Sequence, residues 1–137
     1  MPPEKSLVVR EWLRKAHQDL EVADFLLTNQ PKLSEAAAFH AQQCAEKSLK
    51  AFLTFHDIRF RKIHDMEEIG NQIEKLDPFL KNTVKKAKFL NPFAVEIRYP
   101  GEDDSPTLTE VKEKLLIAKE TYREILKRLP TECAPKS

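Results

Sequence analysis

The apolar residues of segment 108–129 recur at every third or fourth position, and this spacing constrains the fold more than any other feature of the chain. An α-helix turns once every 3.6 residues, so this spacing places the apolar side chains along one face. Thr107 followed by Glu110 matches a capping box at a helix start, and Pro130 follows the last apolar position. We therefore predict one long amphipathic helix here. Its apolar residues are Leu108, Val111, Leu115, Ala118, Tyr122, Ile125 and Leu129.

Two further long helices are predicted in the first half of the chain. Between Leu13 and Leu27 the apolar residues again step by three and four, and Asn29-Gln30-Pro31 ends the pattern, which predicts a helix over about 6–29. The next segment, about 34–56, opens at Ser34 and carries small residues on several faces. Small side chains all round are typical of a central helix that neighbours contact on more than one side.

Shorter helices are predicted in the middle of the chain. Asp65 with Glu68 resembles a capping box, and Asp77-Pro78 is typical of the start of a further helix. Pro92 lacks the amide proton that a helix needs, so this fourth helix should be kinked or broken there. Residues 93–99 alternate as a strand would, but a lone strand has no partner in this sequence, so we predict a helical piece capped by Asn91.

Together these segments predict an all-α fold, an antiparallel up-and-down bundle of about five helices. The chain has 137 residues, which is the length of one domain, and only two of them are glycine. Charged residues make up 33% of the chain, as expected of long surface-exposed helices. We assign the bundle to residues 6–129 and expect the tail 130–137 to be disordered.

The overall charge and the cysteines exclude several classes of function. Lys and Arg number 23 against 22 acidic residues, so there is no overall positive field to hold DNA, and any anion site must be local. Two cysteines form neither a disulfide framework nor a metal-ligand spacing, which favours a reducing compartment. The longest apolar run has four residues, Ala36 to Phe39. We expect a cytoplasmic protein with no membrane partner, no metal and no cofactor.

The most specific stretch of the sequence is FHAQQCAEKSLKAFL, residues 39–53. It is followed by His64-Asp65-Met66 and later by Arg98-Tyr99-Pro100. These three motifs, in this order, resemble the HEPN family over about residues 6–129. The resemblance implies a helical bundle that is commonly a homodimer, nucleotide binding in a cleft between helices, and partnership with a separate small nucleotidyltransferase. Fold alone does not fix activity, so the site residues have to carry the function.

Two lysines of this stretch, Lys47 and Lys50, lie about one helical turn apart on a polar stripe with His40 and Gln43. Two ammonium groups so placed could hold a phosphate. Alternatively, the stripe is a solvated helix face, supported by a weak ion pair between Glu46 and Lys50.

Arg98 and Tyr99 precede a Pro-Gly turn and are the second candidate pair. The guanidinium fork of Arg suits phosphate oxygens, and a Tyr ring can stack on a base. Alternatively, Tyr99 packs under the loop while Arg98 pairs with an acidic residue nearby. The residues that we predict to bind a nucleotide or phosphate are Lys47, Lys50, His64, Arg98 and Tyr99.

Arg59 and His64 match the R-x4-6-H pattern of the ribonuclease branch of the HEPN family. There the His would move protons for attack by a ribose 2′-hydroxyl, and the Arg would stabilise the charge that develops on phosphorus, without a metal. Arg10 and His17 fit the same pattern, so it is not specific. Alternatively, His64 is a structural residue at a helix start.

Three functions therefore remain open on the sequence. The first is a binding module, for a nucleotide, for RNA or for a small nucleotidyltransferase in a two-component system of the toxin–antitoxin kind. The second is a metal-independent endoribonuclease toxin that uses Arg59 and His64. The third is a homodimeric helical scaffold without a ligand.

Overall fold

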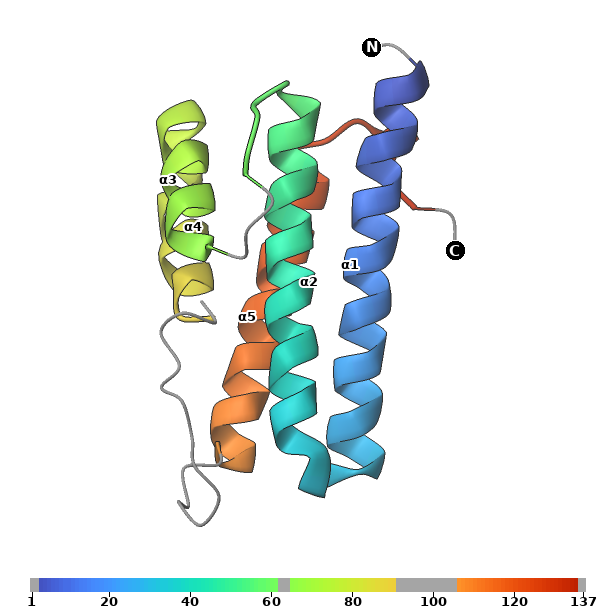
Figure 1. Ribbon diagram of the computed structural model, residues 1–137, viewed down its shortest axis with the longest axis vertical. Coiled ribbons are helices and arrows are strands. Elements are labelled where there is room, and N and C mark those ends of the chain that lie inside the picture. The colour runs from blue at the N-terminus through green and yellow to red at the C-terminus, as the bar shows by residue number, and fades with distance from the viewer. Residues whose placement is uncertain (1–2, 62–64, 91–105, 136–137) are drawn as a thin grey trace.

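The computed structural model is all-helical over the residues that it describes, which are 3–61, 65–90 and 106–135, and this confirms the predicted fold class. Three long helices lie side by side, and two shorter ones form a hairpin beside them (Figure 1). The elements are α1 (Pro3–Asn29), η1 (Pro31–Leu33), α2 (Ser34–Phe55), α3 (Met66–Leu76), η2 (Pro78–Leu80), α4 (Lys81–Lys88), α5 (Leu108–Lys127) and η4 (Thr131–Cys133), where η marks a 3-10 turn.

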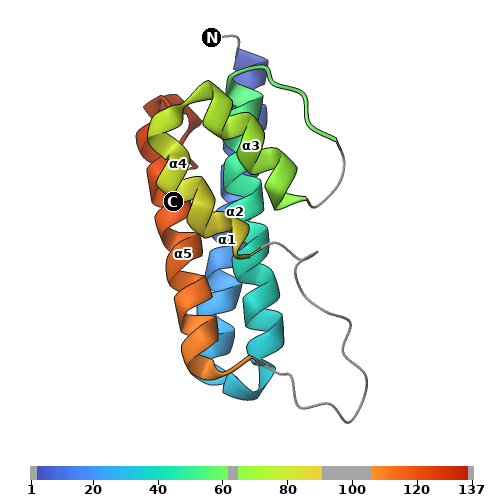
Figure 2. The same cartoon turned by 90° about the vertical axis from the view of Figure 1, so that its left-hand side faces the viewer.

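The helix directions follow from the lengths of the connections. The turn η1 joins α1 to α2, so these two helices run antiparallel. Helices α3 and α4, joined by η2, form a second hairpin that packs against α2 and α5 (Figure 2). Helices α2 and α5 pack together and run in the same direction (Figure 1).

The predicted helix starts are confirmed where a side chain caps the helix. The Asp65 carboxylate accepts hydrogen bonds from the backbone amides of Glu67 and Glu68, and Thr107 Oγ1 accepts one from the amide of Glu110. Asp77 caps the η2 turn through the amide of Phe79. These bonds satisfy amides that have no partner within the helix, which is why a short polar residue precedes each of these three elements.

Helix α2 is the central element, as its small side chains predict. It packs against α1, α3 and α5, and the small residues along it are buried. Small side chains let the neighbouring helices approach closely, and larger residues such as Phe52 and Leu53 then fill the core near its end. The buried small residues of α2 are Ala37, Ala41, Cys44, Ala45, Ser48 and Ala51.

The predicted disordered tail is wrong for the part that the structure describes. Residues Thr131–Cys133 form a turn, and the side chain of Cys133 is fully buried. The Arg10 guanidinium donates hydrogen bonds to the backbone carbonyl of Glu132, which ties the tail to α1. Arg10, which is 122 residues away in the sequence, therefore orders this segment.

Helix α4 ends at Lys88. The predicted break at Pro92 and the predicted helical piece over 93–99 lie outside the described residues.

None of the helices in the described ranges combines the length and the apolar character needed to cross a bilayer. The long helices each keep charged residues along their exposed sides.

At Gly70, helix α3 lies close against the side chains of α4. A Cβ atom built on Gly70 would lie 2.7 Å from Val84 Cγ1, well inside ordinary contact distance. Glycine is unfavourable within a helix, so we attribute its presence here to this lack of space.

We therefore expect Gly70→Val to lower the free energy of unfolding by about 1–3 kcal/mol, the usual cost of overpacking a core. Urea denaturation followed by circular dichroism measures the change. Lys75→Ala, at an exposed position of the same helix, is the matched control and should be close to neutral. A Gly70→Val protein as stable as the wild type would contradict the close packing of the hairpin.

Candidate functional site

The polar stripe of α2 lies against the rest of the bundle and is not the solvated face that one interpretation expected. Gln43 and Lys50 are buried, and His40 and Lys47 are only partly exposed. The predicted ion pair between Glu46 and Lys50 is present, but both side chains are out of solvent. Polar and charged groups in such a position need partners, because burial without them costs free energy.

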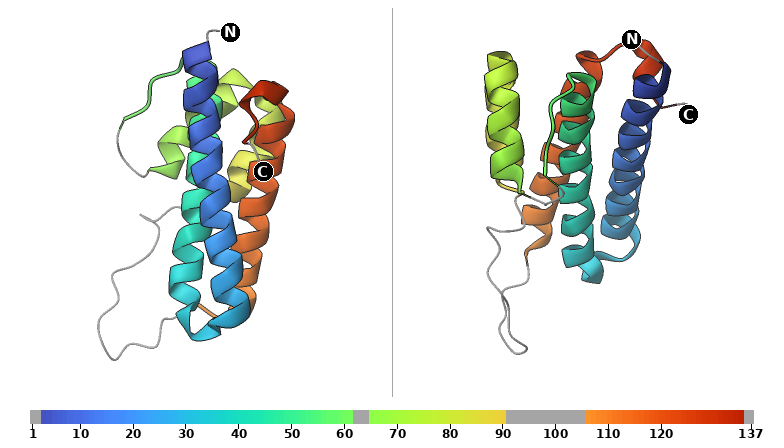
Figure 3. Two further views of the ribbon diagram at one scale, coloured as in Figure 1. Left: turned by 90° about the vertical axis from the view of Figure 1, so that its right-hand side faces the viewer. Right: turned by 45° about the horizontal axis from the view of Figure 1, so that its top comes forward.

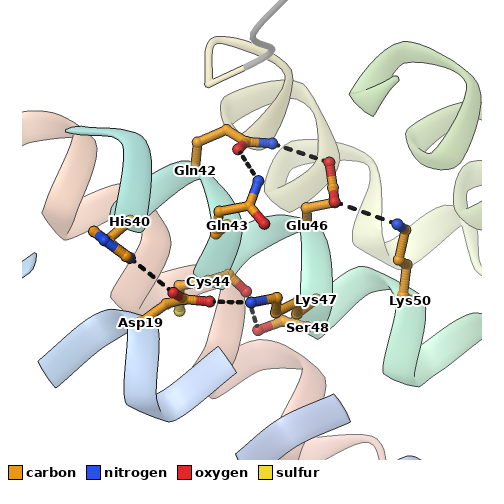
Figure 4. Close-up of polar contacts among 9 residues, drawn as sticks. All are labelled: Asp19, His40, Gln42, Gln43, Cys44, Glu46, Lys47, Ser48 and Lys50. Carbon is orange, nitrogen blue, oxygen red and sulfur yellow. Dashed lines mark hydrogen bonds and ion pairs between the residues drawn. The ribbon is translucent and has the colours of Figure 1, made fainter. Parts of the chain in front are cut away.

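Asp19 of α1 provides the partner for the first half of the stripe. Its Oδ1 lies 2.8 Å from His40 Nδ1, and its Oδ2 lies 2.6 Å from Lys47 Nζ (Figure 4). Asp19 is itself buried, so these two neighbours replace the water that its carboxylate would otherwise bind. One carboxylate thus holds two residues that lie two turns apart on α2.

Glu46 provides the partner for the second half. Its side chain is 1% exposed, and its Oε2 lies 3.3 Å from Lys50 Nζ, whose side chain is 7% exposed. Gln42 Nε2 donates to Glu46 Oε1 at 3.1 Å, and Gln43 Nε2 donates to Gln42 Oε1 at 2.7 Å (Figure 4). The result is a continuous chain of hydrogen bonds along one side of α2.

Two aromatic rings cover the ammonium group of Lys50. Its Nζ lies 5.5 Å from the ring centroid of Trp12 on α1 and 5.5 Å from that of Phe60 in the segment before α3. The two rings meet edge to face, with centroids 6.1 Å apart. Cation–π contacts of this kind are favourable when the cation is desolvated. They fix the segment that carries Phe60 against the α1–α2 face.

The segment between α2 and α3 has a well-anchored main chain. The Arg59 carbonyl accepts a hydrogen bond from Gln72 Nε2 at 2.9 Å, and Arg61 forms an ion pair with Glu68 at 2.5 Å. Near its start, Asp57 has φ 59°, an unusual value for a residue other than glycine, and forms an ion pair with Lys5 of α1. The side chain of Arg59 is exposed.

The structure therefore brings some of the predicted site residues together. Lys47 and Lys50 share the inner side of α2, and Arg59 directly precedes the Phe60 ring that covers Lys50. His64, Arg98 and Tyr99 lie outside the described residues. The binding and catalytic roles of all six residues stay predictions.

Sequence reasoning missed Asp19, the acidic partner of Lys47. Asp19 lies three residues after Ala16 and four before Ala23, so it shares the spacing of the apolar residues of α1. A carboxylate at such a position is the signal that could have predicted a buried acidic residue. Glu46 was noticed as a partner of Lys50, but nothing local shows that both are buried. The covering rings of Trp12 and Phe60 come from segments far apart in sequence, so no spacing predicts them.

Cys44 lies beneath this polar face and is not a reactive thiol. Burial, together with the nearby Asp19 charge, raises the pKa of Cys44 to about 12. The thiol therefore stays protonated at neutral pH, and only a thiolate is nucleophilic. We interpret Cys44 as a small packing residue between α2 and α5.

Three comparisons place this geometry among known proteins. The sequence model of the HEPN domain family matches residues 9–129 of this chain. A Methanocaldococcus jannaschii protein named "Putative toxin MJ1304" is 35% identical over a match of 100 residues, which covers 65% of this chain and 61% of that protein. The crystal structure of ST0689, described as an archaeal HEPN homologue, superimposes with a TM-score of 0.69 at 24% identity, over 88% of this chain and 96% of that one. The last similarity concerns the fold alone.

The two lysines should contribute unequally to stability. Lys50→Met removes the ammonium group that lies 3.3 Å from the carboxylate of buried Glu46, and loss of one partner of a buried pair costs about 3–5 kcal/mol. Lys47→Met should cost clearly less, because the Lys47 side chain is 22% exposed and Asp19 keeps His40 as a second partner.

Chemical denaturation of the two variants and the wild type measures this difference. Methionine keeps most of the hydrocarbon stem in each case, so packing is matched between the two variants. Equal losses of stability, or a larger loss for Lys47→Met, would show that Glu46 does not depend on Lys50.

Proposed function

The chain belongs to the HEPN family, and on this premise we propose that it is a binding module for the phosphate groups of a nucleotide or RNA. The proposed ligand site is formed by Lys47, Lys50 and the segment that leads from Arg59 to His64, together with Arg98 and Tyr99. The chain would act in the cytoplasm as the partner of a separate small nucleotidyltransferase, in a two-component system of the toxin–antitoxin kind.

One observation carries this proposal, namely the packing of Phe60 on Lys50. It brings the arginine-bearing segment before α3 to the face of α2 that holds both lysines. The backbone that carries Arg59 therefore lies beside the face of α2 that holds Lys47 and Lys50, in a chain whose net charge is only +1. A local positive region in a nearly neutral protein is what a small anionic ligand requires.

The geometry also suggests different roles for the two lysines. Lys47 is the more accessible, and its ammonium group has three donors, of which the Asp19 carboxylate engages one. Lys50 is enclosed by Glu46 and two rings, so we assign it a positioning role under the Phe60 segment. Direct contact with phosphate would then fall to Lys47 and to residues of the neighbouring segments.

Membership of the HEPN family supports a nucleotidyltransferase partner. The name of the relative from Methanocaldococcus jannaschii, a putative toxin, supports a role in a system of the toxin–antitoxin kind. The chain spans about three fifths of that relative's length. A small nucleotidyltransferase encoded by the neighbouring reading frame, and a stable complex of the two purified proteins, would support the pair. Failure of the two proteins to associate at micromolar concentrations would count against it.

Nucleotide binding is tested by thermal denaturation with ATP and with GTP. A ligand that binds only the native state raises the melting temperature, so we expect an upward shift that grows with nucleotide concentration. The shift should shrink in Lys47→Ala and in Arg98→Ala. Because Lys47→Ala also loses an internal ion pair, the quantity to compare is the shift that the nucleotide causes in each variant.

Lys75→Ala is the matched control, because it removes one exposed lysine far along α3 and should keep the full shift. The proposed nucleotide site would be contradicted if neither nucleotide changed the melting temperature of the wild type. Equal shifts in the wild type and in all variants would also contradict it.

A metal-independent endoribonuclease is the second candidate, and the position of Arg59 favours it. The main chain of Arg59 is fixed by Gln72 while its side chain is exposed, as expected of a group that must meet a substrate phosphate. His64 would take the proton of the attacking 2′-hydroxyl, and Arg59 would stabilise the negative charge on the phosphate oxygens.

If this candidate is right, RNA is cleaved in the presence of a chelator, and Arg59→Ala and His64→Ala each lose about a hundredfold or more of the rate. Arg61→Ala is the matched control, since it removes a neighbouring arginine whose side chain is paired with Glu68. Cleavage that persists in His64→Ala would indicate a contaminating nuclease.

A further inference from the structure

The two most exposed large apolar side chains among the described residues both lie on the α3–α4 hairpin. Phe79 of η2 is 90% exposed, and Phe89, the residue that follows α4, is 72% exposed. Neither ring fills the core, since the buried positions of this part of the chain are Leu80, Val84 and Ala87. Two rings kept in solvent at the two ends of one short helix are candidates for contact with a ligand.

The helix between the two rings is basic. Its sequence, KNTVKKAK, has four lysines and no acidic residue. Lys86 and Lys88 have acidic partners on α5 and α3. Lys81 and Lys85 are exposed, and no carboxylate of the described residues forms an ion pair with either of them. Two ammonium groups on this helix are therefore free to bind an anion.

Lys81, Lys85 and Phe89 lie along one side of α4. They are four residues apart, which is about one helical turn, so successive positions are separated by about 6 Å along the helix. Phe89 keeps helical backbone angles, with φ −65° and ψ −15°, so the row of side chains continues to its ring. Phe79 lies two residues before Lys81. These four residues, which we call the α4 face, form a surface about 15 Å long with cations between two aromatic rings.

The outer side of the hairpin faces solvent. Figure 3 (right) shows the hairpin at one edge of the molecule, across α2 from α1, and Figure 2 shows α3 and α4 in front of the long helices. Beside Phe89 a hollow of about 550 Å³ lies between α4 and α5, with Leu116 and Ile117 among its lining residues. Glu110 and Glu113 also line this hollow, so it disfavours a phosphate but has room for an uncharged base.

We propose that the α4 face binds a single-stranded nucleic acid, with Lys81 and Lys85 on the phosphates and the rings of Phe79 and Phe89 stacked on unpaired bases. Sites for single strands combine cations along the backbone with aromatic rings for the bases, and such stacking tolerates any base. A duplex hides the faces of its bases, so it cannot use the rings. An acidic protein segment would use the lysines alone.

The α4 face is separate from the site that we propose around Lys47. Lys47 lies on α2 and is paired with Asp19 of α1, whereas the α4 face lies on the outer side of the hairpin. Binding at the α4 face therefore requires neither nucleotide binding nor cleavage. A strand held there would remain bound in a protein whose other site is inactive.

The test is fluorescence anisotropy with a labelled oligouridine whose 2′-hydroxyls are methylated, so that it cannot be cleaved through them, and with oligothymidine of the same length. We expect at least one to bind, and the tighter of the two identifies the ligand as RNA or DNA. Phe79→Ser and Phe89→Ser should each raise the dissociation constant about fivefold or more without changing its salt dependence. Lys81→Ala and Lys85→Ala should each lower the slope of log affinity against log salt by about 0.7.

The matched controls are Phe25→Ser and Lys32→Ala, which remove an exposed ring of α1 and an exposed lysine of η1 and should bind as the wild type does. Circular dichroism checks that every variant keeps its helices. A duplex of the same length should compete poorly. The proposal would be overturned if neither oligonucleotide bound at low salt, or if the controls lost as much affinity as the α4 variants. Lysine variants that bind weakly beside phenylalanine variants that bind normally would indicate a surface for any polyanion and would exclude stacking.

Discussion

The burial of two carboxylates against α2 is the constraint on which the rest of this structure depends. Removing a charge from water costs several kcal/mol unless an opposite charge and further hydrogen bonds replace the lost hydration. Asp19 meets this requirement with Lys47 and His40, and Glu46 meets it with Lys50 and Gln42. The polar residues of α2 are therefore needed for the helices to pack as they do, whatever ligand the protein binds.

This requirement changes what the lysines can do for a ligand. An ammonium group already paired with a carboxylate attracts a phosphate less than a free one does, because the carboxylate repels the anion. The two lysines differ in solvent exposure, and this difference separates the role in stabilising the fold from the role in binding a ligand. Lys50 is enclosed and serves the fold, while Lys47 keeps part of its surface in solvent. A ligand site at this face would depend on Lys50 only through the aromatic side chains that it holds in place.

The helices and their starts could be predicted from the sequence because their signals are local. An apolar residue at every third or fourth position, or an Asp65 two residues before the amide that it caps, needs no knowledge of the rest of the chain. The buried face of α2 could not be predicted in the same way. A polar stripe at a helix interface has the same spacing as a polar stripe in water, and only the position of Asp19 on another helix decides between them. Cys133 is a similar case, since Arg10 orders the tail from the opposite end of the chain.

Trp12 links helix α1 to the buried lysine and to the segment before α3. Its ring meets that of Phe60 edge to face, and the Lys50 ammonium group lies 5.5 Å from the centroid of each ring. The segment that carries Arg59 therefore rests on Trp12 through Phe60. A substitution of Trp12 would reach this segment as well as Lys50, because the same ring contacts both.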